Sequence, residues 1–264
     1  MENVNYNKTN VERCSLEQTK TSLPSKQLSS PIDKDIFLPN NKLKMNEEGG
    51  HLDAMTYPCI FYPTLHKLEE ELSGNGSAIN AIKLLKKSFI NAEQNSPSVL
   101  FDLSLVLLNE AKLNVNLQET YLRMHGSAPT FNFELENLKH IPEFQNLSDR
   151  AIELRKTLSR IPDQMMDRRA FLGTIREIAA AIKNLLEATN SVIQFAPPPC
   201  QQPIEKRKRE FVHYSKRFSN TLRDYFRDQN AQQVSVAANQ LIYQTNQIVR
   251  TVHDKVLKYQ NHVH

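Results

Sequence analysis

Apolar residues recur every three or four positions from Tyr62 onward, the spacing that places them on one face of a helix. Between residues 78 and 95 this face carries Ile79, Ile82, Leu85 and Phe89. The next segment, residues 99–108, is apolar nearly all round, and a helix of this kind must be buried on every side. A few short helices make a poor core of their own, so we expect the surplus apolar surface to pair with a second chain. The alternative is that the second half of the chain covers it.

The C-terminal half has longer apolar stripes joined by short connections. They predict helices that begin near Ser148, Asp163, Pro203 and Ala231, with the proline-rich segment 196–203 separating the second from the third. The last stripe keeps spacings of three and four through Val234, Ala237, Leu241, Thr245, Ile248, Val252 and Val256. Such stripes predict an antiparallel four-helix bundle.

The chain is therefore predicted to be all-α and to contain several parts. Residues 1–55 are polar, follow no sustained period and predict a disordered tail. Residues 56–126 predict an N-terminal helical dimerisation domain. Residues 127–146, which include Pro129 and Pro142, predict an interdomain linker. Residues 147–264 predict the four-helix bundle.

Composition narrows the class of protein. The 264 residues include six glycines and no tryptophan, which argues against sheet-and-turn folds and phosphate-binding loops. No apolar run approaches ~18 residues, the length of a membrane-spanning helix, and the polar N-terminus does not predict a secretory signal. Cys14, Cys59 and Cys200 are too widely spaced for a disulfide framework or a zinc site. We therefore expect an intracellular protein without a metal or cofactor.

The sequence contains no motif typical of an enzyme. Its eight histidines are scattered, and it lacks a phosphate-binding loop, a nucleophile elbow and a metalloprotease motif. Asp163 and Asp167 lie one helical turn apart beside Arg168 and Arg169. We assign this pair to helix-dipole and ion-pair roles rather than to acid–base catalysis. The chain is therefore predicted not to be an enzyme.

Charge is unevenly distributed along the chain. Residues 145–264 carry 19 basic and 11 acidic residues, a net charge of +8, although the whole chain carries only +4. A basic C-terminal half favours an acidic partner, which is a peptide, a membrane surface or nucleic acid. Because no nucleic-acid recognition motif accompanies the charge, nucleic acid is not expected.

Two basic rows on the second and third bundle helices share one spacing. They comprise Arg176, Ala179 and Lys183, then Lys216, Ser219 and Arg223. With Ile175, Ile182 and Leu222 beside them, the two helices would form a groove with an apolar floor and positive rims. Such a groove suits an amphipathic helix that carries leucines and acids. The alternatives are two solvated rows of basic residues, or a peripheral membrane module that binds anionic phosphoinositides through the basic bundle.

Several long stretches resemble the programmed cell death protein 10 family, also called the cerebral cavernous malformations 3 family. The resemblance extends over residues 61–256 without reordering. The stretches include Tyr62-Pro63, Leu122-Arg123-Met124, Pro142-Glu143-Phe144-Gln145, Leu158-Ser159-Arg160-Ile161-Pro162-Asp163 and Ala238-Asn239-Gln240-Leu241-Ile242.

The resemblance implies a non-catalytic adaptor with a helical dimerisation domain and a focal-adhesion-targeting-like bundle. The family's dimerisation surface also pairs with the C-terminal tail of germinal centre kinase III kinases. In this sequence it maps to Leu85, Ser88, Phe89, Leu107 and Leu108. Ser88 departs from the family, which has a small apolar residue at this position.

The resemblance also implies that the bundle groove binds leucine-aspartate motifs of paxillin and a similar helix of the cerebral cavernous malformations 2 scaffold. The basic positions of the family groove fall on Arg176, Lys183, Lys216 and Arg223. Arginine replaces lysine at 176 and 223, which keeps the charge but changes the geometry. Membership of the striatin-interacting phosphatase and kinase complex is implied as well. So is a location in the cytoplasm and at the Golgi. The plasma-membrane periphery is a further candidate location, in keeping with the phosphoinositide-binding alternative.

Overall fold

The computed structural model describes residues 50–263, and within this range all regular structure is helical. Most of the predicted tail, residues 1–49, lies outside the described residues. The prediction that the tail extends to residue 55 is wrong for its last residues. Leu52 and Met55 are buried, and Asp53–Met55 form the 3-10 helix η1.

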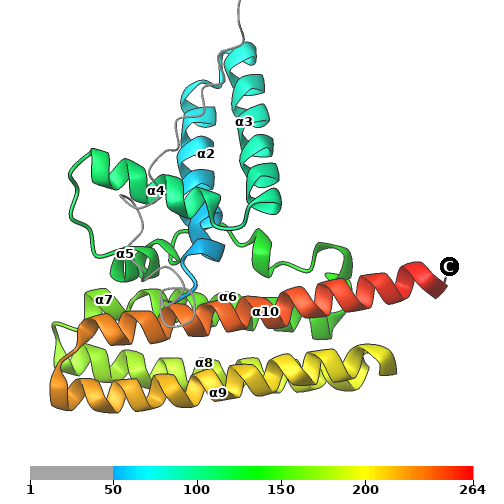
Figure 1. The fold of residues 1–264 in the computed structure, drawn as a ribbon. Helices are drawn as coiled ribbons and strands as arrows, with labels where there is room; N and C mark the ends of the chain where they lie inside the picture. The colour runs from blue at the N-terminus through cyan, green and yellow to red at the C-terminus, as the bar shows by residue number, and fades with distance from the viewer. Residues whose placement is uncertain (1–49, 264) are drawn as a thin grey trace, which may run out of the picture. The chain divides into compact units, whose positions relative to one another are not determined.

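The N-terminal region contains η2 and three α-helices (Figure 1). Their bounds are Tyr57–Phe61 for η2, Tyr62–Glu71 for α2, Gly76–Asn95 for α3 and Val99–Glu110 for α4. Asn75 begins α3, because its side chain accepts a hydrogen bond from the backbone N–H of Ala78. The Glu93 carboxylate accepts from the backbone N–H groups of Ser98 and Leu100, so it satisfies donors at the start of α4.

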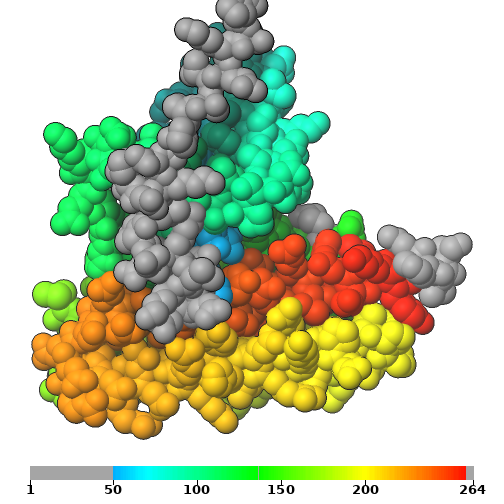
Figure 2. Space-filling model, viewed as in Figure 1, coloured from blue at the N-terminus to red at the C-terminus, as the bar shows by residue number. Residues whose placement is uncertain are grey.

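The C-terminal region is a bundle in which α6 packs on α8 and α9 packs on α10 (Figure 1). The long helices are α6 (Pro142–Ser159), α8 (Arg168–Phe195), α9 (Pro198–Asp228) and α10 (Ala231–Val263). Two short helices, α5 (Leu117–Met124) and α7 (Ile161–Gln164), pack against them. In the space-filling view, α9 and α10 are in close contact along their length (Figure 2).

The predicted stripes form the core of this bundle. Phe211, Phe218, Leu241 and Ile248 are at most 1% exposed. Each such side chain contributes about 1.5–3 kcal/mol when it is removed from water. The antiparallel four-helix arrangement predicted from the periodicity is therefore present, and its apolar stripes meet at the centre.

Three predicted helix starts are wrong. The first bundle helix begins at Pro142 rather than near Ser148, which is buried inside it. The second begins at Arg168 rather than Asp163, because the Asp167 carboxylate accepts from the backbone N–H groups of Arg169 and Ala170 and caps a new helix. The third begins at Pro198, since a first helical turn tolerates proline.

The segment 127–146, predicted as a linker, is packed. It contains η3 (Phe131–Phe133), η4 (Glu136–Leu138) and the start of α6. Phe133, Leu135 and Leu138 are at most 4% exposed and belong to the core. Proline and glycine signalled turns correctly here, but the apolar residues between them are anchored rather than free.

Candidate protein-docking surfaces

The N-terminal helices expose a large apolar surface. Within α3, all of which the structure describes, only Ile82 is buried, whereas Leu84 and Leu85 are 66% and 42% exposed. In α4, Leu107 is 55% exposed and Val106 is 44% exposed. The bundle therefore leaves this surface exposed, which argues against the alternative that the second half of the chain covers it. Exposure of several large apolar side chains on neighbouring helices is typical of an interaction surface.

The residues predicted to form the dimer surface have mixed exposure. Leu85, Ser88 and Leu107 are exposed, while Phe89 and Leu108 are half-buried. Phe89 packs edge-on against Phe61, with ring centroids 5.0 Å apart, and so helps to hold α3 against the end of η2. The Ser88 hydroxyl donates to the Leu84 carbonyl at 2.9 Å, so its hydrogen bond is already made inside α3.

An ion pair joins α3 to α2. The Lys86 ammonium lies 2.5 Å from the Glu69 carboxylate and 5.2 Å from the centre of the Tyr62 ring. Both partners of this ion pair are largely shielded from solvent, which makes it stronger than a fully exposed pair. Helix α3, which carries part of the apolar surface, is therefore held against α2.

The second candidate surface lies between α8 and α9. The rings of Phe171 on α8 and Phe226 on α9 approach to 5.8 Å, which identifies the flanks on which the two helices meet. On the same flank of α8, Ile175 and Ile182 lie one and three turns from Phe171 and are half-buried. Leu222 lies one turn from Phe226 and is 7% exposed. These side chains lie on the flanks of α8 and α9 where the sequence predicts an apolar floor.

The cations predicted to border this floor are exposed. Arg176, Lys183, Lys216 and Arg223 are all exposed, as are Ala179 and Ser219. Because the helices are antiparallel and Phe171 meets Phe226, Arg176 lies near the level of Arg223 and Lys183 near that of Lys216. Lys183 is 3.7 Å from Glu187 in an exposed pair. Within residues 50–263, no ion pair engages Arg176, Lys216 or Arg223.

Two family models match the chain and identify its family. The family model of the programmed cell death protein 10 dimerisation domain matches residues 49–114, and that of the C-terminal domain of the same protein matches residues 115–210. The chain belongs to the programmed cell death protein 10 family. The programmed cell death protein 10 homolog of Caenorhabditis elegans is 52% identical over 212 residues, which is 80% of this chain and 99% of the relative.

The family domains correspond to the two surfaces. The exposed apolar helices α3 and α4 lie within the family's dimerisation domain, and α8 and the first part of α9 lie within its C-terminal domain. Neither matched domain is an enzyme domain. Helix α5 falls in the C-terminal domain, and it packs against α10 and α6 accordingly. None of the helices described in this family member is long and apolar enough to cross a membrane.

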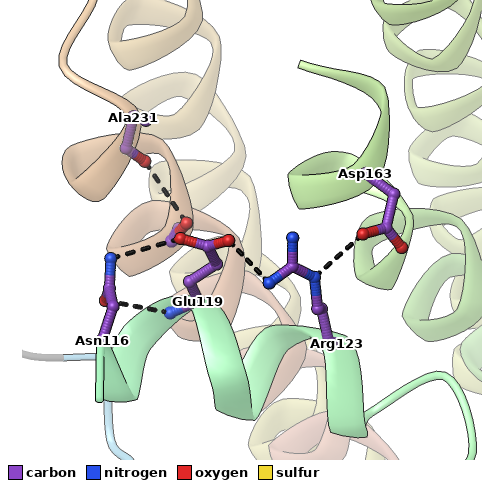
Figure 3. A network of polar contacts seen from close by, with 6 residues as sticks. Asn116, Glu119, Arg123, Asp163 and Ala231 are labelled. Atoms are coloured by element: carbon purple, nitrogen blue, oxygen red, sulfur yellow. Dashed lines mark hydrogen bonds and ion pairs between the residues drawn. The ribbon is translucent and has the colours of Figure 1, made fainter. Parts of the chain in front are cut away.

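A polar network ties α5 to the bundle (Figure 3). Asn116 caps α5 by accepting from the backbone N–H of Glu119, and the Glu119 carboxylate lies 2.7 Å from the guanidinium of Arg123. The same Arg123 donates from Nε to Asp163 at 2.8 Å, which joins α5 to α7. Asp163 thus makes an ion pair and Asp167 caps a helix, the roles that the sequence assigned to them, although the two residues do not share one helix as their spacing predicted.

A buried histidine holds the segment before α2 against α5, and no pattern in the sequence signalled it. His125 Nε2 lies 2.8 Å from the sulfur of Met55, and Nδ1 lies 3.5 Å from Sγ of Cys59. Burial, with a smaller effect of Arg155, lowers the pKa of His125 to about 3. Burial also raises the pKa of the Cys59 thiol to about 12, so Cys59 stays a thiol and is a poor nucleophile.

The protonation of His125 predicts acid sensitivity. The pKa of His125 is about 3 in the folded chain, whereas an unperturbed histidine has a pKa of 6.5, so the unfolded chain binds the proton first. The contribution of His125 to the free energy of unfolding is therefore fully present above pH 6.5. It falls by about 1.4 kcal/mol per pH unit as the pH drops from there toward 3. Urea unfolding at pH 7.5 and pH 5 measures this loss.

The control separates His125 from the other titrating groups. His125→Gln removes the titration, so the stability lost between pH 7.5 and pH 5 shrinks by about 2 kcal/mol. The matched variant His66→Gln changes an exposed histidine and leaves the loss as it is in the natural chain. An equal loss in all three proteins would contradict the assignment to His125.

Proposed function

We propose that this chain is a non-enzymatic adaptor that dimerises through α3 and α4 and binds acidic amphipathic helices between α8 and α9. The observation that carries the proposal is the pairing of two different surfaces on one chain. One is apolar and lies in a dimerisation domain; the other is apolar at its floor and cationic at its rims. The match to a dimerisation domain supports a binding role.

The apolar surface is proposed to serve two partners in turn. A second copy of the chain covers Leu85, Leu107 and their neighbours in the homodimer. The C-terminal tail of a germinal centre kinase III kinase takes the same surface in a heterodimer. Through the kinase and striatin the adaptor joins the striatin-interacting phosphatase and kinase complex, in the cytoplasm and at the Golgi.

The α8/α9 groove is proposed to bind leucine-aspartate helices of the paxillin type and the related helix of the cerebral cavernous malformations 2 scaffold. Leucines of the ligand would pack on Ile175, Ile182 and Leu222, and its acids would face the cations on the rims. The rim charges are exposed, so they act mainly on the rate of association and on the choice of ligand.

Charge reversal tests the groove. We expect Lys183→Asp with Lys216→Asp to weaken binding of a leucine-aspartate peptide by about 10- to 100-fold, because two rim cations become repulsive. Isothermal titration calorimetry measures the affinity, and circular dichroism checks that helicity is unchanged. Both positions are exposed, so the substitutions should leave the stability of the fold nearly unchanged.

A charge-matched control uses cations outside the groove. Lys206→Asp with Arg250→Asp makes the same change in net charge on α9 and α10. This control should keep the affinity within about threefold, since distant exposed charges act only through a screened field. Equal losses in the two double variants would show general charge attraction and would remove the groove assignment.

A second candidate function is attraction to a membrane surface. The observation that favours it is the number of cations that α9 exposes outside the groove, among them Lys206, Arg209 and Arg217. Anionic headgroups attract such a helix by about 1 kcal/mol per cation near the surface. Flotation with phosphoinositide vesicles tests this candidate, and the Lys206→Asp with Arg250→Asp variant should then lose more binding than the groove variant.

A further inference from the structure

A concave site of mixed polar and apolar lining lies where α8 begins and α9 ends. This end of the bundle is at the left of Figure 1. We name it the end cup; its apolar lining is Met165, Met166, Phe171, Tyr225 and Phe226, and its polar lining is Arg168 and Gln229. Its volume is about 330 Å³. This volume is sufficient for one bulky apolar side chain and too small for a helix.

Two apolar side chains of the end cup are exposed to solvent. Met166 is 94% exposed and Phe226 is 42% exposed. Because Asp167 caps α8, the helix begins at Arg168 and Met165 and Met166 precede it. No part of the described bundle covers Met166. The ring of Phe171 meets those of Tyr225 and Phe226 at 5.4 and 5.8 Å and forms a firm floor. A flexible methionine over an aromatic floor adapts well to an inserted side chain.

The end cup continues the α8/α9 groove. Phe226 follows Leu222 of the groove floor by one helical turn, and Phe171 precedes Ile175 by one turn. At 1.5 Å per residue, Phe171 lies ~18 Å along α8 from Lys183 at the other end of the groove. A helix that covers all four rim cations therefore ends beside the end cup, within reach of one more turn.

The charge beside the end cup matches that of the groove. Arg168 lines it, and Arg223 lies one turn from Phe226. In the described part of the chain neither arginine has an ion-pair partner. The neighbouring acids are engaged, since Arg227 pairs with Asp224 and Asp228. The Asp167 carboxylate is likewise occupied by backbone N–H groups.

We propose that the end cup binds a bulky apolar side chain of the same acidic helix that occupies the groove, one turn beyond the leucines that contact the floor. The ligand class is thus narrower than an acidic amphipathic helix: it carries an additional phenylalanine, leucine or methionine next to one end. This inference rests on the groove function proposed above, and it adds the residues that select among acidic helices.

The experiment compares three synthetic peptides. The core peptide is an acidic amphipathic helix with leucines at positions i, i+3, i+4 and i+7, and two longer peptides carry a phenylalanine one turn before or one turn after this core. We expect one of the two longer peptides to bind the full chain about tenfold more tightly than the core peptide, because a ring leaves water. Equal affinity of all three peptides would overturn the end-cup proposal.

Methyl NMR of the methionines locates the added contact. The anchored peptide should shift the Met166 methyl signal, and the core peptide should leave it in place. Met166→Asp should remove the tenfold gain without changing the affinity for the core peptide, while Met166→Leu should keep the gain. A Met166 shift that depends on protein concentration alone would show a second copy of the chain in the end cup and would overturn the proposal.

The same peptides distinguish a failure of the proposed groove function from a failure of the end-cup proposal alone. If the core peptide does not bind, or if Lys183→Asp with Lys216→Asp leaves its affinity unchanged, the groove function itself is wrong. If the core peptide binds and responds to that variant but no added phenylalanine strengthens it, only the end-cup proposal fails.

Discussion

Leu85→Asp with Leu107→Asp should turn the dimer into a monomer. Both side chains are about half exposed in the single chain, at 42% and 55%, so the substitutions cost little in the fold of the monomer. In a symmetric dimer they place two aspartates on each side of an apolar interface, and each buried unpaired charge costs several kcal/mol. We expect the dissociation constant to rise at least about 1,000-fold.

Sedimentation velocity across a range of concentrations measures this change. The control is Met166→Asp, which adds a charge at a residue that is 94% exposed and outside the dimerisation domain. It should sediment as the natural chain does. A double variant that remains dimeric at micromolar concentration would show that α3 and α4 do not form the interface. The same variant should also lose the kinase tail if the two partners share this surface.

Arg155→Met should destabilise the fold by about 2–4 kcal/mol. Arg155 is 2% exposed, and its guanidinium donates to the carbonyl oxygens of Pro129 at 2.8 Å and Ala128 at 2.7 Å. It also lies 5.0 Å from the centre of the Phe133 ring. Methionine keeps much of the apolar volume but leaves two carbonyl groups without these donors. The segment 127–133 would then lose its attachment to α6.

Urea unfolding at pH 7.5 measures this loss, and two further variants interpret it. Arg155→Lys keeps the charge but cannot bridge two carbonyl groups with a planar fork, so its loss should be intermediate. Arg150→Met removes an exposed ion pair with Glu153 on the same helix and should cost less than about 0.5 kcal/mol. If Arg155→Met were as stable as Arg150→Met, the two hydrogen bonds would not anchor the segment.

The parts of the fold that the sequence predicted are those set by periodicity. The helices of the bundle and its buried stripe through Phe211, Phe218 and Leu241 follow from spacings of three and four. The errors concern boundaries, where one side chain decides. Asp167 caps α8, and Pro198 and Pro199 start α9 although prolines usually signal the end of a helix.

Contacts between distant residues were beyond the reach of the sequence. His125 meets Met55 and Cys59, which lie about 70 residues earlier, and no local pattern distinguishes it from the exposed histidines. Likewise, the turn residues around Pro129 do not reveal that Phe133 and Leu138 are buried. The two basic rows lie on α8 and α9, and the rings of Phe171 and Phe226 bring these helices together near one end of the rows, but that the rows border a binding groove stays a prediction.

Light scattering on the purified full chain, alone and with a germinal centre kinase III C-terminal tail, tests the central claim most directly. We expect a homodimer that converts to a one-to-one complex as the tail is added, because both partners need the apolar surface of α3 and α4. A monomer with an unchanged mass in the presence of the tail would contradict this claim. So would a tail that binds to an intact dimer.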